Sequence, residues 1–304
     1  MQEISEYQSD CREVVLLGDI FDFWRARPEC AVKDALPFLR RLEEDGLKIR
    51  YVVGNHDHHL VVQKQEAEFL ERAARGDIFP VYIPDLRWRQ TFAGIDVETF
   101  YPCYRKMCGG RAFLFTHGHH LDGIQTLTLQ LVERMRRLSG EEILPADLEM
   151  MMTYAYESIY RSAYIGEMVS FEDFVWKASG LLQRFTMAVF SQQHPASVQS
   201  QYGAVLQFIR DRNLGQVDCF IYGDTHRAGI FQRKGGPLAV NTGCFARFSS
   251  TGSPASISAS MSGINLASFA QGSETPDTYL LLDDDGLALR QLGRKRPLFL
   301  CELF

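Results

Sequence analysis

The sequence predicts an α/β fold in which a frame of strands and helices is interrupted by a long helical insertion. Short apolar runs that are typical of buried strands alternate with helical patterns through residues 1–120. Residues 121–212 keep helical periodicity with almost no strand signal, and strand patterns return within residues 213–304. We therefore expect the first and last parts to build one frame, with the insertion lying over its site as a lid.

The first part carries the clearest alternation of strand and helix. Residues 14–17 form a short apolar run, and residues 32–43 repeat leucine at helical spacing. Residues 80–102 are rich in β-branched and aromatic side chains, with a turn signal at residues 93–94. The strands expected here are 14–17, 49–53, 80–88, 91–102 and 111–115, and the helices are 32–43 and 64–75.

The rest of the chain divides into the insertion and the returning strands. The insertion is broken near Gly140, Pro145 and Pro195, which gives helices at 121–138, 146–168, 171–190 and 196–212. Residues 249–275 are rich in Ser, Gly and Ala and predict an irregular loop. The strands expected after the insertion are 218–222, 229–232, 238–241, 278–282 and 287–292.

The composition limits the classes of function. The chain has 304 residues, of which 46% are hydrophobic and 23% charged, as in ordinary globular proteins. A net charge of −6 argues against a broad nucleic-acid surface. No apolar run reaches bilayer length and no signal pattern precedes residue 14, so we expect a cytoplasmic protein. The Met- and aromatic-rich insertion favours helix packing, with peripheral membrane contact as the alternative.

Four polar clusters each follow an apolar run, where a strand is expected to end. Aspartate, asparagine and histidine there supply mixed oxygen and nitrogen ligands, which suit Mn²⁺, Fe²⁺, Zn²⁺ or Co²⁺. Two such ions can activate a hydroxide and hold a phosphoryl group for in-line displacement. The clusters therefore predict a metal-dependent hydrolase. They are Gly18-Asp19, Gly54-Asn55-His56-Asp57, His117-Gly118-His119-His120 and Gly223-Asp224-Thr225-His226.

These clusters resemble, in order, the motifs of the calcineurin-like metallophosphoesterases. That family carries D-x-H, G-D-x-x-D/E, G-N-H-D/E, a lone His after a strand, and G-H-x-H, and the likeness here spans roughly residues 14–243. The resemblance implies a sandwich of two mixed β-sheets flanked by helices, with a helical insertion as lid. It also implies two divalent metal ions, with Mn²⁺ as the first choice.

The resemblance assigns metal ligands residue by residue. Asp19 would be the bridging carboxylate, Asn55 and His117 would bind the second metal, and His226 would bind the first. Asp224 stands where the family has a ligand histidine. A carboxylate can still bind a metal, so we expect Asp224 to be a ligand rather than only a turn residue.

The remaining candidates would act on the substrate. By the same resemblance, His56 would protonate the leaving oxygen or stabilise the transition state while a metal-bound hydroxide attacks phosphorus. His119 and Asp57 are the candidates for contacting the substrate. For His119, as for His58, His59 and His120 that also flank the motifs, the sequence favours a position that faces solvent or supports a ligand, with substrate contact as the alternative and His119 as the best candidate for it.

The GDIFDFW stretch and the His-Gly-His-x-x-Asp stretch look most like the branch that contains UDP-2,3-diacylglucosamine diphosphatase. This implies a phosphorylated small molecule or lipid-linked nucleotide sugar, cleaved at its pyrophosphate. The bacterial enzymes of that branch have Arg where His56 stands, which weakens the match to that lipid. The alternatives are a phosphomonoesterase or phosphodiesterase of another substrate, and a non-catalytic member that binds a phosphorylated ligand.

The D-x-H motif is missing from residues 1–18, where Asp10 is followed by Cys11 and Arg12. In the family this motif ends the first strand and supplies two ligands to the first metal. We expect the natural start to lie upstream, which translation of the preceding DNA would show. A chain that begins at Met1 is expected to hold one metal and to be severely impaired as a phosphatase.

Overall fold

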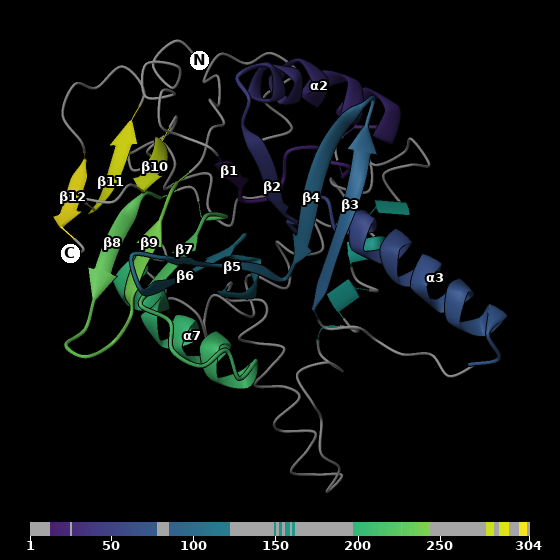
Figure 1. The fold of residues 1–304 in the computed structure, drawn as a ribbon. Helices are drawn as coiled ribbons and strands as arrows, with labels where there is room; N and C mark the ends of the chain where they lie inside the picture. Colours follow the sequence, from purple (N-terminus) through teal and green to yellow (C-terminus); the bar gives the residue numbers. More distant parts are fainter. Residues whose placement is uncertain are drawn as a thin grey trace, which may run out of the picture.

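The structure is a computed structural model (Figure 1). It describes residues 13–24, 26–77, 85–121, 149, 152–153, 156–158, 160–161, 197–225, 227–243, 278–282, 286–291 and 298–302. Most of the predicted insertion and the predicted loop at 249–275 lie outside the described residues, so the division into three parts stays a prediction. The described residues between 149 and 161 are helical, as expected.

The first sheet has strand order β1-β2-β4-β3. Its members are β1 (Glu13–Leu16), β2 (Lys48–Val52), β3 (Leu86–Phe92) and β4 (Ile95–Tyr101). Strands β1, β2 and β4 are parallel, and β3 pairs antiparallel with β4. Ala93 and Gly94 connect that hairpin with positive φ angles of 49° and 92°, the conformation that a tight two-residue turn requires. The turn signal in the sequence is therefore confirmed.

Two helices follow strands of the first sheet: α2 (Pro28–Glu44) follows β1, and α3 (His59–Ala74) follows β2. Helix α2 begins with Pro28 in its first turn, where the missing N–H costs no hydrogen bond. It buries Ala31, Ala35, Leu39 and Leu42, which lie on one face of the helix. That face packs against β2 and β4, and Figure 1 shows α2 lying across one end of this sheet.

The second sheet has strand order β5-β6-β7-β9-β8. Its members are β5 (Cys103–Cys108), β6 (Arg111–Thr116), β7 (Cys219–Tyr222), β8 (Gly229–Gln232) and β9 (Leu238–Asn241). Strands β6, β7 and β9 are parallel, whereas β5 and β8 close the edges antiparallel. Helix α7 (Val198–Asp211) packs on β8 and β9, with Ser197 as its N-cap. This helix corresponds to the predicted helix at 196–212.

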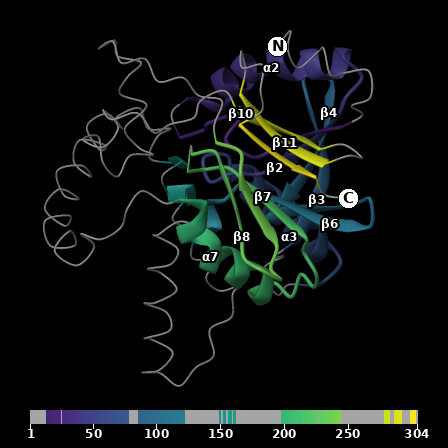
Figure 2. The ribbon, with the colours of Figure 1, turned by 90° about the vertical axis from the view of Figure 1, so that its left-hand side faces the viewer.

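The two sheets pack face to face because their strands alternate side chains between two sides. In β7, Cys219 and Ile221 join the cluster between the sheets, and Phe220 and Tyr222 join the cluster under α7. In β2, Val52 faces the second sheet while Ile49 joins the core under α2. The turned view shows the sheets between α2 and α7 (Figure 2). The predicted fold class, two mixed sheets flanked by helices, is confirmed.

A separate sheet of order β10-β11-β12 lies against one end of the sandwich. It consists of β10 (Thr278–Leu282), β11 (Gly286–Gln291) and β12 (Phe299–Glu302), all antiparallel. Leu287 of β11 is 1% exposed and completes the cluster between the two main sheets. The sequence predicted β10 and β11 but neither β12 nor β5.

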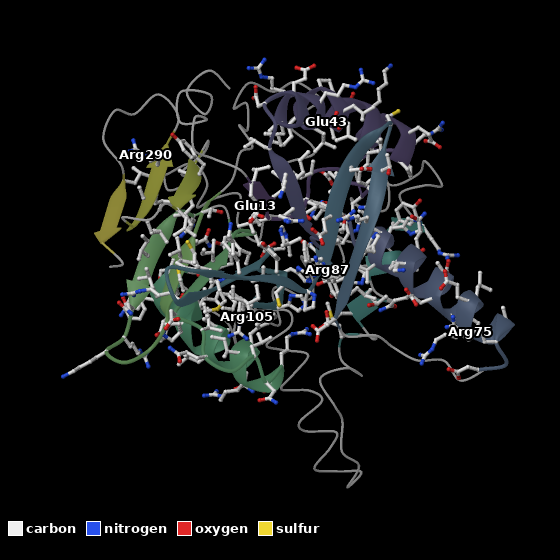
Figure 3. All side chains as sticks on the ribbon, in the orientation of Figure 1. Glu13, Glu43, Arg75, Arg87, Arg105 and Arg290 are labelled. Atoms are coloured by element: carbon white, nitrogen blue, oxygen red, sulfur yellow. The ribbon has the colours of Figure 1, made fainter. Side chains whose placement is uncertain are left out.

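An ion network joins the two sheets near β1. Glu13 accepts hydrogen bonds from Arg50 on β2 at 3.1 Å and from Lys106 on β5 at 2.9 Å. Figure 3 labels Glu13 near the meeting of the sheets and Arg87 on β3, where Arg87 pairs with Glu98 of β4. None of the helices in the described part of the chain is long and apolar enough to span a membrane.

Candidate metal centre

The predicted clusters converge because parallel strands bring their carboxyl ends to one edge. Gly18 and Asp19 follow β1, the 54–57 cluster follows β2, His117 follows β6 and Asp224 follows β7. Asp19 and Asp224 adopt left-handed φ angles of 55° and 65°. Such conformations are uncommon for residues with a side chain and cluster at functional sites.

His117 lies at the middle of the group. Its Nε2 lies 3.0 Å from Asn55 Oδ1, 3.2 Å from Asp19 Oδ2 and 3.3 Å from Asp224 Oδ1. Its Nδ1 donates a hydrogen bond to the Leu17 carbonyl, which fixes the ring and directs Nε2 at the three oxygens. Four of the predicted ligands are thereby brought together.

The approach of these groups depends on two glycines. A Cβ on Gly18 would overlap the His117 ring, and a Cβ on Gly54 would overlap the Asp19 carboxylate. Gly18 also has a φ of +83°, which favours glycine. The glycines of both motifs therefore let Asp19 and His117 come close.

The charges of this group fit a divalent cation. Burial would lower the pKa of His117, but Asp19 and Asp224 raise it well above its usual value. Burial would also raise the pKa of Asp19, which His117 and His56 instead lower. A nitrogen that faces three oxygens needs a positive charge between them, and either a proton or a metal ion supplies it. Asp19, His117 and Asp224 offer ligand atoms within 4.8 Å of one another, so the residues fit the metal.

His56 lies beside the group, held by two contacts. Its Nδ1 lies 2.6 Å from Asp22 Oδ1, and the Trp24 ring stacks on it with centroids 4.2 Å apart. Its backbone N–H donates to Asp19 Oδ1 at 3.0 Å, which ties the position of the imidazole to that of the carboxylate. Asp22 and Trp24 belong to the GDIFDFW stretch, but the sequence prediction gave neither of them a role.

Asp57 is 0% exposed and holds the loop that follows β1. Its carboxylate accepts backbone hydrogen bonds from Ile20, Phe21 and Asp22 at 3.0, 3.2 and 2.9 Å. Tyr51 Oη also donates to it. Burial and the neighbouring Asp19 raise the pKa of Asp57 to about 7. These contacts fix the loop that carries Asp19, and the predicted contact of Asp57 with substrate stays a prediction.

His119 is buried beside the centre, with 3% of its surface exposed. Its ring centroid lies 5.5 Å from that of His117 and 3.9 Å from that of His120. Neither of its ring nitrogens has a hydrogen-bond partner among the described residues. Burial, together with His120, lowers the pKa of His119 well below its usual value. The predicted contact of His119 with substrate stays a prediction.

The family model of the calcineurin-like phosphoesterases matches residues 4–228, about three quarters of the chain. The chain belongs to this family. Calcineurin-like phosphoesterases hydrolyse phosphoric esters with bound divalent metals, typically two. A comparison with curated proteins finds no match.

Membership in the calcineurin-like phosphoesterase family gives the geometry its chemical meaning. Asp19, Asn55, His117 and Asp224 are the candidate ligands of a metal centre of the family, and Asp224 lies close enough to the others to share an ion with them. His226, the other predicted ligand of the last cluster, lies outside the described residues.

Several residues around this phosphoesterase centre escaped the sequence prediction. Trp24 carried no sequence signal for its stacking on His56, whereas Asp22 stands at the last position of the G-D-x-x-D/E motif. Glu149 and Arg212 meet beside His120, although 63 residues separate them and no local pattern joins them. Only the motif position of Asp22 could have revealed its role in advance.

Proposed function

We propose that this calcineurin-like phosphoesterase hydrolyses a phosphoester or pyrophosphate at the centre formed by Asp19, Asn55, His117 and Asp224. One observation carries the proposal: His117 Nε2 faces three oxygens at 3.0–3.3 Å, and His56 stands next to them. A metal-ligand set beside an oriented imidazole is what phosphoryl transfer to water requires.

The chain's own residues would prepare the site. Asp19 and Asp224 supply anionic oxygens, and Asn55 and His117 supply neutral donors. Divalent cations, when bound, would activate the attacking water and offset the charge that develops on the phosphoryl oxygens. Mn²⁺ is our first choice, with Fe²⁺, Zn²⁺ and Co²⁺ as alternatives, because the ligands mix oxygen and nitrogen.

His56 would assist the leaving group. Its Nδ1–H donates to Asp22, so the proton that the reaction needs would be carried on Nε2. As the bond between phosphorus and the leaving oxygen breaks, that proton would pass to the oxygen. Stacking on Trp24 would keep the ring in position during this transfer.

A His56→Asn variant tests this role. We expect kcat to fall about 10²–10⁴-fold, as for the loss of a general acid, with unchanged metal affinity. Steady-state kinetics in Mn²⁺ and calorimetric metal titration measure the two effects. A His56→Asn enzyme with wild-type kcat would remove His56 from the mechanism.

The proposed substrate is a phosphorylated small molecule, with a lipid-linked nucleotide sugar as the specific candidate. Support comes from the GDIFDFW stretch, whose Asp22 and Trp24 hold His56. Initial rates with UDP-diacylglucosamine, bis-p-nitrophenyl phosphate and p-nitrophenyl phosphate would separate diphosphatase, diesterase and monoesterase activity. We keep the cytoplasm as its location, with peripheral membrane contact to be tested by vesicle flotation.

A second candidate function is the binding of a phosphorylated ligand without catalysis. Asp224 favours it, because a carboxylate in place of the family histidine adds negative charge and weakens the Lewis acidity of a bound ion. Activity in a Mn²⁺-loaded sample that His117→Ala abolishes would rule it out. Metal binding without turnover of any of the three substrates would favour it.

A further inference from the structure

Glu149, which belongs to the predicted insertion (residues 121–212), is a buried carboxylate that contacts three elements of the frame. His120 Nε2 lies 2.7 Å from its Oε1, and Arg212 donates to its Oε2 at 2.5 Å. Tyr101 Oη, at the end of β4, also donates to Oε1. Burial would raise the pKa of Glu149, but His120, Arg212 and Tyr101 lower it. Both carboxylate oxygens therefore take part in one charge-compensated network.

This network has the residue types of a metal site but not its charge balance. His119, His120 and Glu149 offer ligand atoms within 4.8 Å of one another. Arg212 already neutralises Glu149, so a divalent cation held by neutral imidazoles would leave two positive charges buried. Uncompensated buried charge is strongly unfavourable. We therefore interpret this cluster not as a second metal site but as a set of bonds between side chains that supports the neighbouring metal centre.

This cluster connects to the metal centre through the loop of residues 117–121. His120 lies in the 3-10 helix His119–Leu121, three residues after the ligand His117. The His117 carbonyl accepts from Gly223 N–H at 2.8 Å, next to Asp224. A Cβ on Gly118 would lie 3.1 Å from the Gly223 carbonyl, so the two ligand-bearing loops are closely packed. A rotation of His120 would shift this packing and with it His117.

We propose that Glu149 is a positioning residue for the metal centre, which acts through His120 to orient the 117–121 loop and its ligand His117. The inference rests on the proposed function, because it assigns that metal centre a supporting residue.

A Glu149→Gln variant provides the test, measured by calorimetric titration of the metal-free protein with Mn²⁺. Loss of a partner that orients a metal ligand typically weakens metal binding 10–100-fold, and we expect a loss of about 10-fold. Glu157→Gln is the matched control, because Glu157 lies on the same segment and bonds His59 at 2.9 Å, away from the 117–121 loop. We expect its Mn²⁺ affinity to stay within about twofold of wild type.

Two further variants separate positioning from general damage. Since Glu149 and His120 act through one bond, His120→Asn with Glu149→Gln should lose no more affinity than the larger single loss. Glu149→Gln removes a carboxylate that faces the Arg212 charge. Glu149→Gln with Arg212→Gln removes both charges of this pair and provides the same test if the single variant fails to fold.

The outcomes distinguish this inference from the proposed function. Wild-type protein that binds no Mn²⁺ would overturn the proposed metal centre and, with it, this inference. Wild-type protein that binds Mn²⁺, with Glu149→Gln binding it equally well, would overturn the inference alone. Equal losses in Glu149→Gln and Glu157→Gln would also overturn it, because the effect would then not depend on the bond between Glu149 and His120.

Discussion

Two histidine-containing clusters lie side by side in this molecule, and their charges differ. Around His117 gather the carboxylates of Asp19 and Asp224, with no arginine or lysine among the contacts recorded for the described residues. Around His120, the carboxylate of Glu149 is matched by Arg212. Ligand-type residues at metal spacing occur in both clusters, but two carboxylates face His117 in the first, whereas the carboxylate of the second is paired with an arginine.

Both clusters contain ligand-type residues, so ligand type does not distinguish them. The difference lies in whether each carboxylate already has a positively charged partner. A divalent cation would neutralise the His117 cluster, whereas it would leave the His120 cluster strongly positive. On the proposed assignment, Arg212 makes the difference between two groups of similar ligand type. The predictions below test this division at each cluster.

The largest effect is expected from Asp19→Asn. This substitution removes one of the two carboxylates of the His117 cluster, the proposed bridging ligand. We expect both Mn²⁺ affinity and activity to fall by more than about 100-fold. That is the upper limit for losing a residue that only bonds to a metal ligand. Calorimetry and phosphatase assays measure both. Metal binding that survives in Asp19→Asn but disappears in Glu149→Gln would reverse the assignment of the two clusters.

Arg212→Gln is the second test, and it acts on stability. Breaking a buried ion pair by removing one partner leaves Glu149 uncompensated and should cost about 3–5 kcal/mol of unfolding free energy. Asp224→Asn in metal-free protein is the matched variant at the other cluster. It leaves His117 paired with Asp19, so we expect a change within about 1 kcal/mol. Urea denaturation measures both, and similar losses in the two variants would contradict the comparison.

The sequence predicted the His117 cluster far better than the His120 cluster, and the reason is physical. Each ligand of the first cluster directly follows a strand, so a local pattern of apolar run and polar turn marks it. Glu149 and Arg212 are joined only by a contact across 63 residues, which leaves no periodic signal. The hydrogen bonds that Asp57 accepts from the backbone of residues 20–22 likewise leave no local signal in the sequence, because they connect two separate loops.

The fold shows the same limit. Strands with continuous apolar runs, such as β6 and β7, were predicted within a residue or two. Strand β5 was missed because it lies at a sheet edge and has two consecutive charged residues, Arg105 and Lys106, at its centre, which interrupts any apolar run. Helix α3 begins at His59, five residues before the predicted start, because its first turn carries the apolar Leu60 and Val61 that pack in the core.

The smallest expected effect is a pH dependence confined to the His117 cluster. The pKa of His117 is raised above 6.5, so metal-free protein holds a proton there at neutral pH, and the pairing with Asp19 and Asp224 stabilises it. That stability is fully present below pH 6.5 and is lost as pH rises through the raised pKa.

A cation must displace this proton, so Mn²⁺ affinity should rise about tenfold between pH 6.5 and 7.5. Calorimetry in two buffers of different ionisation enthalpy should show about one proton released per cation. An affinity that is flat over this range would mean that His117 is already neutral in the metal-free protein, which would contradict the raised pKa and the release of a proton on metal binding.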